Sequence, residues 1–278
     1  MIKKPDWLRI PYFDEKSSDL ISGVLDDLSL NTVCIEANCP NRGECFSNKT
    51  ATFMILGTNC TRKCTFCNVK YGEPEPVDLH EAERIALAVE KLNLNYVVIT
   101  SVTRDDLPDG GAQHFSNVIT AIKISNPETR VEVLIPDLNE LKVITVSSPD
   151  VISHNIETVK SLYNDVRPGA DYIRSLNVLQ NIKQLEPEIY TKSGIMLGLG
   201  ESREEVLKAF DDLLTVGCDF LTIGQYLAPT KAHYSVKEYI HPSVFEEYKK
   251  IADNMGFRYV SSSPFVRSSY MAGNALIL

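Results

Sequence analysis

Short apolar runs alternate with amphipathic stretches along the chain from residue 51 onward. Each run is apolar throughout rather than at every second position, which is typical of strands in a parallel sheet with both faces covered. The runs cover residues 51–57, 96–101, 130–135, 151–156, 193–200 and 220–226. Strands that alternate with helices in this way predict an α/β fold of right-handed βα units, either a barrel or an open doubly wound sheet.

Signals for helix starts and ends lie between these runs. Asp78 with Glu81, and Ser202 with Glu205, have the spacing of capping boxes, which satisfy the first free backbone donors of a helix. Gly256 follows a helical stretch and predicts its C-terminal end. The apolar stripes of the expected helices, each of which requires a sheet to cover, fall within residues 85–92, 115–122, 176–185, 206–214 and 244–255.

Both ends of the chain depart from this pattern. Residues 1–50 contain few periodic apolar positions and hold the cysteine-rich stretch CIEANCPNRGEC. We therefore expect residues 1–50 to form an extension shaped by a ligand rather than by an apolar core. We expect the βα body to cover residues 51–240, and a C-terminal helix and tail with the sequence RSSY to cover residues 241–278.

The composition is that of a soluble globular protein. The 278 residues are 44% hydrophobic, and no stretch approaches the roughly 18 consecutive apolar residues that a membrane span requires. The start at Met1 lacks the apolar run of a secretory signal, so we expect a cytoplasmic protein. A net charge of −9 argues against binding to nucleic acid or to an anionic membrane, and we expect neither partner.

Six of the seven cysteines lie between residues 34 and 67, which in a reducing cytosol indicates metal binding or catalysis rather than disulfides. Cys60, Cys64 and Cys67 follow the first expected strand with C-x3-C-x2-C spacing. Three thiolates this close together can bind one iron–sulfur cubane and leave its fourth iron without a protein ligand. The loop after a strand is also where βα folds place their reactive centres.

Cys34, Cys39 and Cys45 form a second triad that is also one ligand short. Two incomplete triads suggest two clusters, each with a fourth ligand that is not cysteine. Structural zinc is the alternative, but zinc prefers four ligands that usually come in closely spaced pairs. Cys218 stands alone, and we expect it to be a small buried apolar residue.

The C-x3-C-x2-C motif, with Phe66 before its last cysteine, resembles the signature of radical S-adenosylmethionine (SAM) enzymes. Within that superfamily, CIEANCPNRGEC, TSVTRDDLPDGGAQHF and RSSY together, in this order, resemble the lipoyl synthase family. The resemblance covers essentially the whole chain. It implies an α/β fold built as a partial open (β/α)6 barrel of the radical SAM type, with a cysteine-rich N-terminal extension.

The resemblance also implies the cofactors, which are two [4Fe-4S] clusters and SAM. Cys60, Cys64 and Cys67 would bind the cluster whose open iron is chelated by the amino and carboxylate groups of SAM. The auxiliary cluster would be bound by Cys34, Cys39, Cys45 and Ser269, with Ser268 as the alternative serine.

Further residues are candidates for contact with SAM. They are Phe66, Ser101, Asn155 and Glu157, with Arg104 beside Ser101 in the motif. For the polar residues the alternative is helix capping or the satisfaction of backbone groups at strand ends.

The activity implied by the resemblance is that of a transferase, specifically a sulfurtransferase of lipoate biosynthesis. It inserts two sulfur atoms at C6 and C8 of a protein-bound N6-octanoyl-lysine and takes them from the auxiliary cluster. Saturated C–H bonds have no useful acidity, so a radical has to activate them, and the cofactor supplies it.

The implied partners are octanoylated lipoyl carrier domains, namely the glycine cleavage H protein and the E2 subunits of 2-oxoacid dehydrogenases, and a ferredoxin or flavodoxin type reductant. One alternative is another radical SAM sulfur-inserting enzyme, similar to biotin synthase or to tRNA methylthiotransferases. A two-cluster electron carrier is another, although it needs neither an open iron nor a large α/β body.

Overall fold

The computed structural model describes residues 3–9, 15–37, 39–47 and 52–276 and divides into two compact units. Unit 1 consists of Met1–Ile10, Arg62–Cys67 and Ser153–Ser268. Unit 2 consists of Pro11–Thr61, Asn68–Ile152 and Ser269–Leu278. Each unit is described by itself.

Parallel strands form the centre of unit 2. β2 (Thr52–Ile55) pairs with β5 (Tyr96–Ser101), and β5 pairs with β6 (Arg130–Leu134). Most side chains of these strands are buried, and the exceptions lie at the strand ends, as continuous apolar runs predict for strands covered on both faces. The expected strands over 51–57, 96–101 and 130–135 are therefore confirmed, while Ala51 lies outside the described residues.

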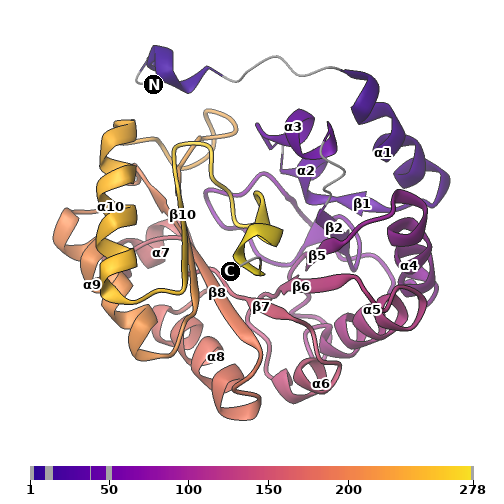
Figure 1. The fold of residues 1–278 in the computed structure, drawn as a ribbon. Helices are drawn as coiled ribbons and strands as arrows, with labels where there is room; N and C mark the ends of the chain where they lie inside the picture. Colours follow the sequence, from indigo (N-terminus) through magenta and orange to yellow (C-terminus); the bar gives the residue numbers. More distant parts are fainter. Residues whose placement is uncertain (1–2, 10–14, 38, 48–51, 277–278) are drawn as a thin grey trace. The chain divides into compact units, whose positions relative to one another are not determined.

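Two helices, α4 (Glu81–Leu92) and α5 (Ala112–Ser125), lie side by side and flank these strands (Figure 1). Their predicted apolar stripes are buried, from Ile85 and Val89 in α4 to Phe115 and Ile119 in α5. The shorter α6 (Leu141–Val146) follows β6 and packs against α5.

The N-terminal part of unit 2 contributes apolar side chains to the packing of that unit, which the expectation of an extension shaped by a ligand rather than by an apolar core does not include. α1 (Glu15–Asp27) buries Ile21 and Leu25 and packs against α4. β1 (Asn31–Thr32) then pairs antiparallel with β2. One i, i+4 pair in a mostly polar helix is too weak a periodic signal to be recognised in the sequence.

Only one of the two predicted capping boxes forms. The Ser202 hydroxyl accepts a hydrogen bond from the Glu205 amide, and the Glu205 carboxylate accepts one from the Ser202 amide, so this box is confirmed. The box at Asp78 and Glu81 is wrong, because α4 begins after His80 and the Glu81 carboxylate faces the buried Leu56 amide instead.

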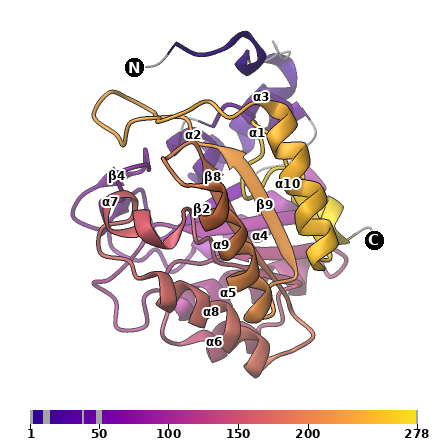
Figure 2. The same ribbon diagram turned by 90° about the vertical axis from the view of Figure 1, so that its left-hand side faces the viewer.

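Unit 1 contains a second set of parallel strands, β8 (Tyr190–Leu197), β9 (Phe220–Gln225) and β10 (Tyr259–Ser262). Three helices accompany them, α8 (Tyr172–Leu185), α9 (Arg203–Thr215) and α10 (Pro242–Met255). α9 and α10 lie side by side (Figure 2), where the Phe210 and Tyr248 rings meet edge to face with centroids 5.9 Å apart. α10 ends at Gly256 with φ of +113°, as predicted.

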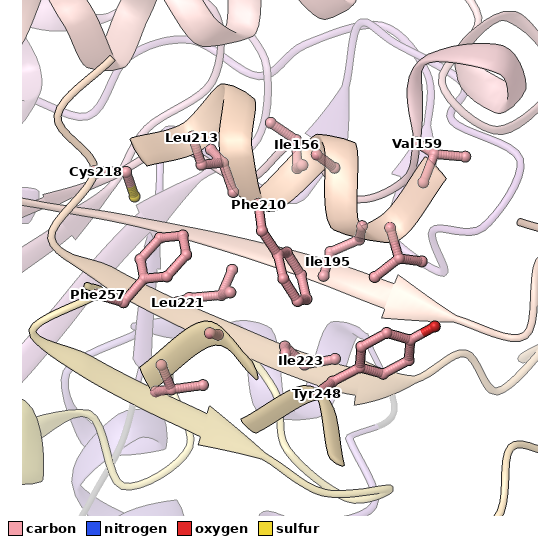
Figure 3. Close-up of a cluster of buried hydrophobic side chains, with 14 of the residues drawn as sticks. Ile156, Val159, Ile195, Phe210, Leu213, Cys218, Leu221, Ile223, Tyr248 and Phe257 are labelled. Carbon is pink, nitrogen blue, oxygen red and sulfur yellow. The ribbon is translucent and has the colours of Figure 1, made fainter. Parts of the chain in front are cut away.

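The apolar core of unit 1 fills the space between these helices and strands (Figure 3). Phe210 and Leu213 of α9 meet Leu221 and Ile223 of β9 in this core, and all four are fully buried. Cys218 belongs to the same core, and its burial raises the pKa of the thiol, so the expectation of a packing role is confirmed.

The remaining elements are short. β7 (Val151–Ser153) lies where the chain passes from unit 2 to unit 1. The others are η1 (Asp6–Leu8), α2 (Val33–Glu36), α3 (Arg42–Ser47), β3 (Asn59–Cys60), β4 (Lys70–Tyr71), η2 (Lys160–Leu162), α7 (Tyr163–Val166) and η3 (Ala272–Leu276). Within the described ranges, no helix has the length and apolarity needed to cross a membrane.

Replacing Ser202 with Ala should destabilise the protein by about 1 kcal/mol, because one amide of α9 loses its cap. The matched control is His80→Ala at the N-cap of α4, where the native side chain makes no capping bond. Urea-induced unfolding of both variants measures the difference. Equal midpoints for the two variants would contradict the prediction.

Candidate functional site

Cys60 lies in unit 2, in a short strand held by backbone hydrogen bonds. The pair of β3 and β4 is extended by a bond from the Gly72 amide to the Cys60 carbonyl (3.2 Å). The Thr103 amide donates to Cys60 Sγ at 3.3 Å. Hydrogen bonds to cysteine sulfurs are among the factors that set the reduction potential of an iron–sulfur cluster.

The segment after β5 also holds the residue next to Cys60. The Thr61 amide and hydroxyl both donate to the Thr103 carbonyl, at 3.1 and 3.0 Å. The Asp105 amide donates to the Thr61 hydroxyl at 3.1 Å. Part of the motif TSVTRDDLPDGG therefore serves to fix the backbone around Cys60.

Cys64 and Cys67 lie in unit 1, in a turn closed by a bond from the Cys67 amide to the Cys64 carbonyl (3.2 Å). Thr65 anchors the turn, since its amide donates to the Val166 carbonyl and its carbonyl accepts from the Tyr234 amide. His233 Nε2 lies 3.0 Å from the Cys67 carbonyl oxygen.

Phe66 is partly buried in the same turn and packs against a small apolar cluster of Val166, Leu199 and Tyr226. This packing gives Phe66 a structural role as an anchor of the cysteine turn.

Hydrogen bonds of the backbone and of the Thr32 side chain hold the second cysteine segment, in unit 2. The Thr32 hydroxyl caps α2 by accepting from the Cys34 amide at 3.2 Å, and it donates to the Thr52 carbonyl of β2. The Cys39 amide then donates to the Cys34 carbonyl at 3.1 Å, and the Cys45 amide donates to the Asn41 carbonyl at 2.9 Å. These bonds attach the segment to the edge of the sheet.

The electrostatics of this triad suit a metal centre. Cys34 and Cys45 are buried and Cys39 is partly exposed. Burial, together with the nearby Cys34, Cys39 and Glu44, raises the pKa of the Cys45 thiol to about 12. A bound cation reverses this effect, because it stabilises the thiolates that otherwise repel one another.

The donor set fits an iron–sulfur cluster, since thiolates are its usual protein ligands. Within the described ranges, no three His, Cys, Asp or Glu side chains converge as ligands of one metal ion would. The cysteines of a cubane each bind a different iron, so they do not need to converge in that way.

The segment that leads to RSSY runs along β9 in unit 1. The Ser263 amide donates to the Ile223 carbonyl, and the Gln225 amide donates to the Pro264 carbonyl, both at 3.2 Å. A side chain at Gly224 would collide with the Val266 carbonyl oxygen. Glycine at position 224 is therefore what allows the two backbones to approach so closely.

The two serines of RSSY have different surroundings. In unit 1, the Ser268 hydroxyl donates to Asn155 Oδ1 at 3.0 Å. In unit 2, the Tyr270 hydroxyl donates to Glu44 Oε1 at 3.0 Å, and Glu44 directly precedes Cys45. No hydrogen bond from the Ser269 side chain to another described residue is present. The tail is thus tied to α3 next to the cysteine triad, and Ser269 is the serine beside that tie.

Asn155, which is buried, and Glu157, which is partly buried, form a polar pair in unit 1. Asn155 Nδ2 donates to Glu157 Oε1 at 3.0 Å, and Arg167 Nη1 donates to the Asn155 carbonyl at 2.9 Å. Burial raises the pKa of the Glu157 carboxyl, although Arg167 and Asn155 oppose the shift. Glu157 also has a φ of +64°, which is unusual for a residue other than glycine and is often found at functional sites.

Ser101 and Arg104 of unit 2 differ in what they leave available. Ser101 Oγ is buried and has no hydrogen-bond partner among the described residues, so it can accept or donate a bond to a ligand. Arg104 is only 3% exposed and is bound to Asp106 and to the Leu56 carbonyl. The guanidinium of Arg104 is thus engaged by contacts within the protein.

Three contacts that hold the cysteine segments were not predicted from the sequence. Thr103 acts through its backbone amide, which leaves no side-chain signal in the sequence. His233 is far from Cys67 along the chain. The bond between Glu44 and Tyr270 joins two motifs that the sequence does identify, but their pairing requires the fold.

Comparison with known proteins identifies the family. Residues 54–213 match the Radical SAM superfamily. The chain is 61% identical over 274 residues to a lipoyl synthase of Caldicellulosiruptor saccharolyticus, covering 97% of this chain and 96% of that protein. It is 55% identical over 278 residues to a lipoyl synthase of Alkaliphilus metalliredigens, covering 99% and 96% respectively.

Solved structures agree at the level of the fold. The crystal structure of methylornithine synthase is similar with a TM-score of 0.57 at 14% identity, covering 90% of this chain and 79% of that one. At this identity the likeness concerns the fold alone. Together with the match to the Radical SAM superfamily, it confirms the expected α/β fold of the radical SAM type. From the superfamily match and the identity over nearly its full length, the chain belongs to the lipoyl synthase family of radical SAM enzymes.

Proposed function

We propose that this protein inserts two sulfur atoms at C6 and C8 of an octanoyl group carried as N6-octanoyl-lysine on a lipoyl carrier domain. The observation that carries the proposal is the bond between Tyr270 and Glu44, which ties the C-terminal RSSY motif to the helix that holds Cys45. It supports a single centre built from the two motifs that distinguish this family from radical SAM enzymes with one cluster.

Cys60, Cys64 and Cys67 are the proposed ligands of the cluster that binds SAM. When bound, the cluster and SAM supply the radical that breaks an unactivated C–H bond. The protein's part is to hold the three sulfurs and to limit solvent access. The Thr103 amide helps to hold the Cys60 sulfur, and the apolar cluster around Phe66 limits solvent access.

Cys34, Cys39, Cys45 and Ser269 are the proposed ligands of the auxiliary cluster, which is the sulfur source. Ser269 is favoured over Ser268, because Ser268 is engaged with Asn155 whereas Ser269 lies next to the bond between Tyr270 and Glu44. An alkoxide is a harder ligand than a thiolate and is replaced more readily on iron. This suits a cluster that gives up its sulfur.

Ser101, Asn155, Glu157 and Phe66 are the proposed contacts of SAM. The hydroxyl of Ser101, which has no partner among the described residues, and the partly buried carboxylate of Glu157 are hydrogen-bonding groups suited to its polar parts. The proposed partners are the glycine cleavage H protein, the E2 subunits of 2-oxoacid dehydrogenases, and a ferredoxin or flavodoxin type reductant.

The reconstituted protein should convert an octanoyl-lysine peptide from a carrier domain to the lipoyl form and cleave about two SAM molecules for each lipoyl group. Mass spectrometry of the peptide and quantification of 5′-deoxyadenosine measure both. SAM cleavage without sulfur insertion would indicate a different substrate, and no SAM cleavage would favour an electron carrier.

Ser269→Ala should abolish sulfur insertion while leaving cleavage of SAM intact, because only the auxiliary cluster loses a ligand. Ser268→Ala is the matched control, one residue away, and should retain sulfur insertion. Iron and sulfide analysis of the two variants checks their cluster content. Loss of sulfur insertion in Ser268→Ala but not in Ser269→Ala would assign the ligand to Ser268.

Glu157→Gln should weaken SAM binding but not destabilise the apoprotein at pH 7.5. The folded-state pKa of Glu157 is raised, so its ionised form costs folding free energy above that pKa. The cost is absent below the unfolded-state value of about 4.3, so any gain in stability from the substitution should disappear as the pH falls. Thermal unfolding across this pH range and equilibrium SAM binding test both parts. Lower stability with unchanged SAM affinity would make Glu157 a structural residue only.

A further inference from the structure

The turn between β2 and β3 of unit 2 has an unfavourable backbone conformation. Leu56 has a φ of +68° and Gly57 a φ of +92°. The left-handed conformation is unfavourable for a residue with a side chain, so neighbouring groups must hold Leu56 in place. This turn sets the direction in which the chain enters β3 and therefore the position of Cys60.

The first group that holds the turn is the pair of Glu81 and His114. Glu81 Oε2 accepts a hydrogen bond from the Leu56 amide at 3.0 Å, and His114 Nε2 lies 2.7 Å from the same oxygen. Both side chains are only 7% exposed. His114 thus orients the Glu81 carboxylate, which in turn fixes the amide side of the left-handed residue.

The second group is Arg104, which fixes the carbonyl side of the same residue. Arg104 Nη1 donates to the Leu56 carbonyl at 3.2 Å. Asp106 orients the guanidinium, since its carboxylate accepts from Arg104 Nε at 2.9 Å and from Nη2 at 2.8 Å. Arg104 directly follows Thr103, whose amide donates to Cys60 Sγ.

The turn has no room to relax. A side chain on Gly111 would collide with Leu56, and one on Gly57 would collide with Glu75. Glu75 also accepts hydrogen bonds from the amide and the hydroxyl of Thr58, at 2.8 and 2.9 Å. Consequently the Glu75 side chain and the Gly111 backbone, both from later parts of the chain, pack closely against the turn.

Buried charged groups are a poor means of gaining stability alone. An ion pair removed from water often contributes no more than an apolar pair of the same size, so its benefit lies in fixing one geometry. Here the buried contact of His114 with Glu81, and the pair of buried Arg104 with the partly exposed Asp106, meet the two backbone groups of a single residue, four positions before Cys60.

We propose that Arg104 and the pair of Glu81 and His114 are positioning residues, which clamp Leu56 from both sides and thereby set the geometry of Cys60 at the SAM-binding cluster. The inference rests on the proposed role of Cys60 as a cluster ligand. The His and Arg of the motif TSVTRDDLPDGGAQHF thus act through the backbone rather than on SAM.

Arg104→Gln and Glu81→Gln test the clamp in the full-length reconstituted protein, and Arg104→Lys shows whether charge alone suffices. The matched control is Arg84→Gln. Arg84 also pairs with an aspartate, Asp78, and also donates to a backbone carbonyl, that of Leu28, but it does not contact the turn. The readouts are the SAM-dependent change in the EPR spectrum of the reduced protein, the midpoint potential of that signal, 5′-deoxyadenosine formation and thermal unfolding of the apoprotein.

Loss of a group that orients a metal ligand typically lowers metal affinity or activity about 10- to 100-fold, and we expect a loss in this range for Arg104→Gln. The SAM-dependent EPR signal and the midpoint potential should shift in Arg104→Gln. Both should shift by a smaller amount in Glu81→Gln. Arg104→Lys should not restore the native values. Arg84→Gln should retain the native values.

Native spectra, potential and rates in Arg104→Gln and Glu81→Gln would overturn the inference. The inference would also be overturned if the two variants unfold at a lower temperature than Arg84→Gln but keep the native EPR signal for each folded molecule. The residues would then be purely structural. If the unsubstituted protein shows no SAM-dependent signal, the proposed function fails rather than the clamp.

Discussion

Segments that carry cysteine ligands have to be held by hydrogen bonds, because they offer little apolar surface for a core. This constraint explains the most specific contacts of the molecule. In unit 2, Cys60 and Thr61 are bound to the backbone of Thr103, and Cys34 is attached to β2 through Thr32. In unit 1, Thr65 is bound on both sides by backbone groups. The cysteine-bearing segments are thus held by hydrogen bonds to β2 and to the segment after β5 in unit 2, and to Val166 and Tyr234 in unit 1.

Such an arrangement requires strands that do not move, and the cores of the two units provide them. In unit 1, side chains such as Phe210 and Ile223 are fully buried, and truncating a large one to alanine would cost about 3–5 kcal/mol. In unit 2, the strands are buried on both faces and their helices pack against each other. Stability therefore comes from apolar packing, while the position of the ligands comes from polar contacts.

The polar groups of these sites are arranged for binding rather than for stability. Burial raises the pKa of Cys45 to about 12 and also raises that of Glu157. Ser101 Oγ is buried without a partner among the described residues, and Leu56 and Glu157 have left-handed backbones. Each of these features costs folding free energy, and each lies where a ligand or a ligand-bearing turn is proposed.

The sequence by itself determined the strand and helix pattern, the two cysteine triads and the family, because continuous apolar runs, helical stripes and close cysteine spacings are local signals. The capping signal at Ser202 predicted a helix start correctly, whereas the one at Asp78 did not. The Glu81 carboxylate accepts a hydrogen bond from the Leu56 amide and contacts His114 instead of capping the helix. The sequence also missed the apolar packing of α1.

Only the tertiary structure decided which distant groups meet. The pairing of Glu44 with Tyr270, the bond from Thr103 to Cys60, and the use of Arg104 inside the protein join residues that are far apart in the chain or act through the backbone. Such contacts depend on how strands pair and helices pack, and no local pattern of residues encodes them.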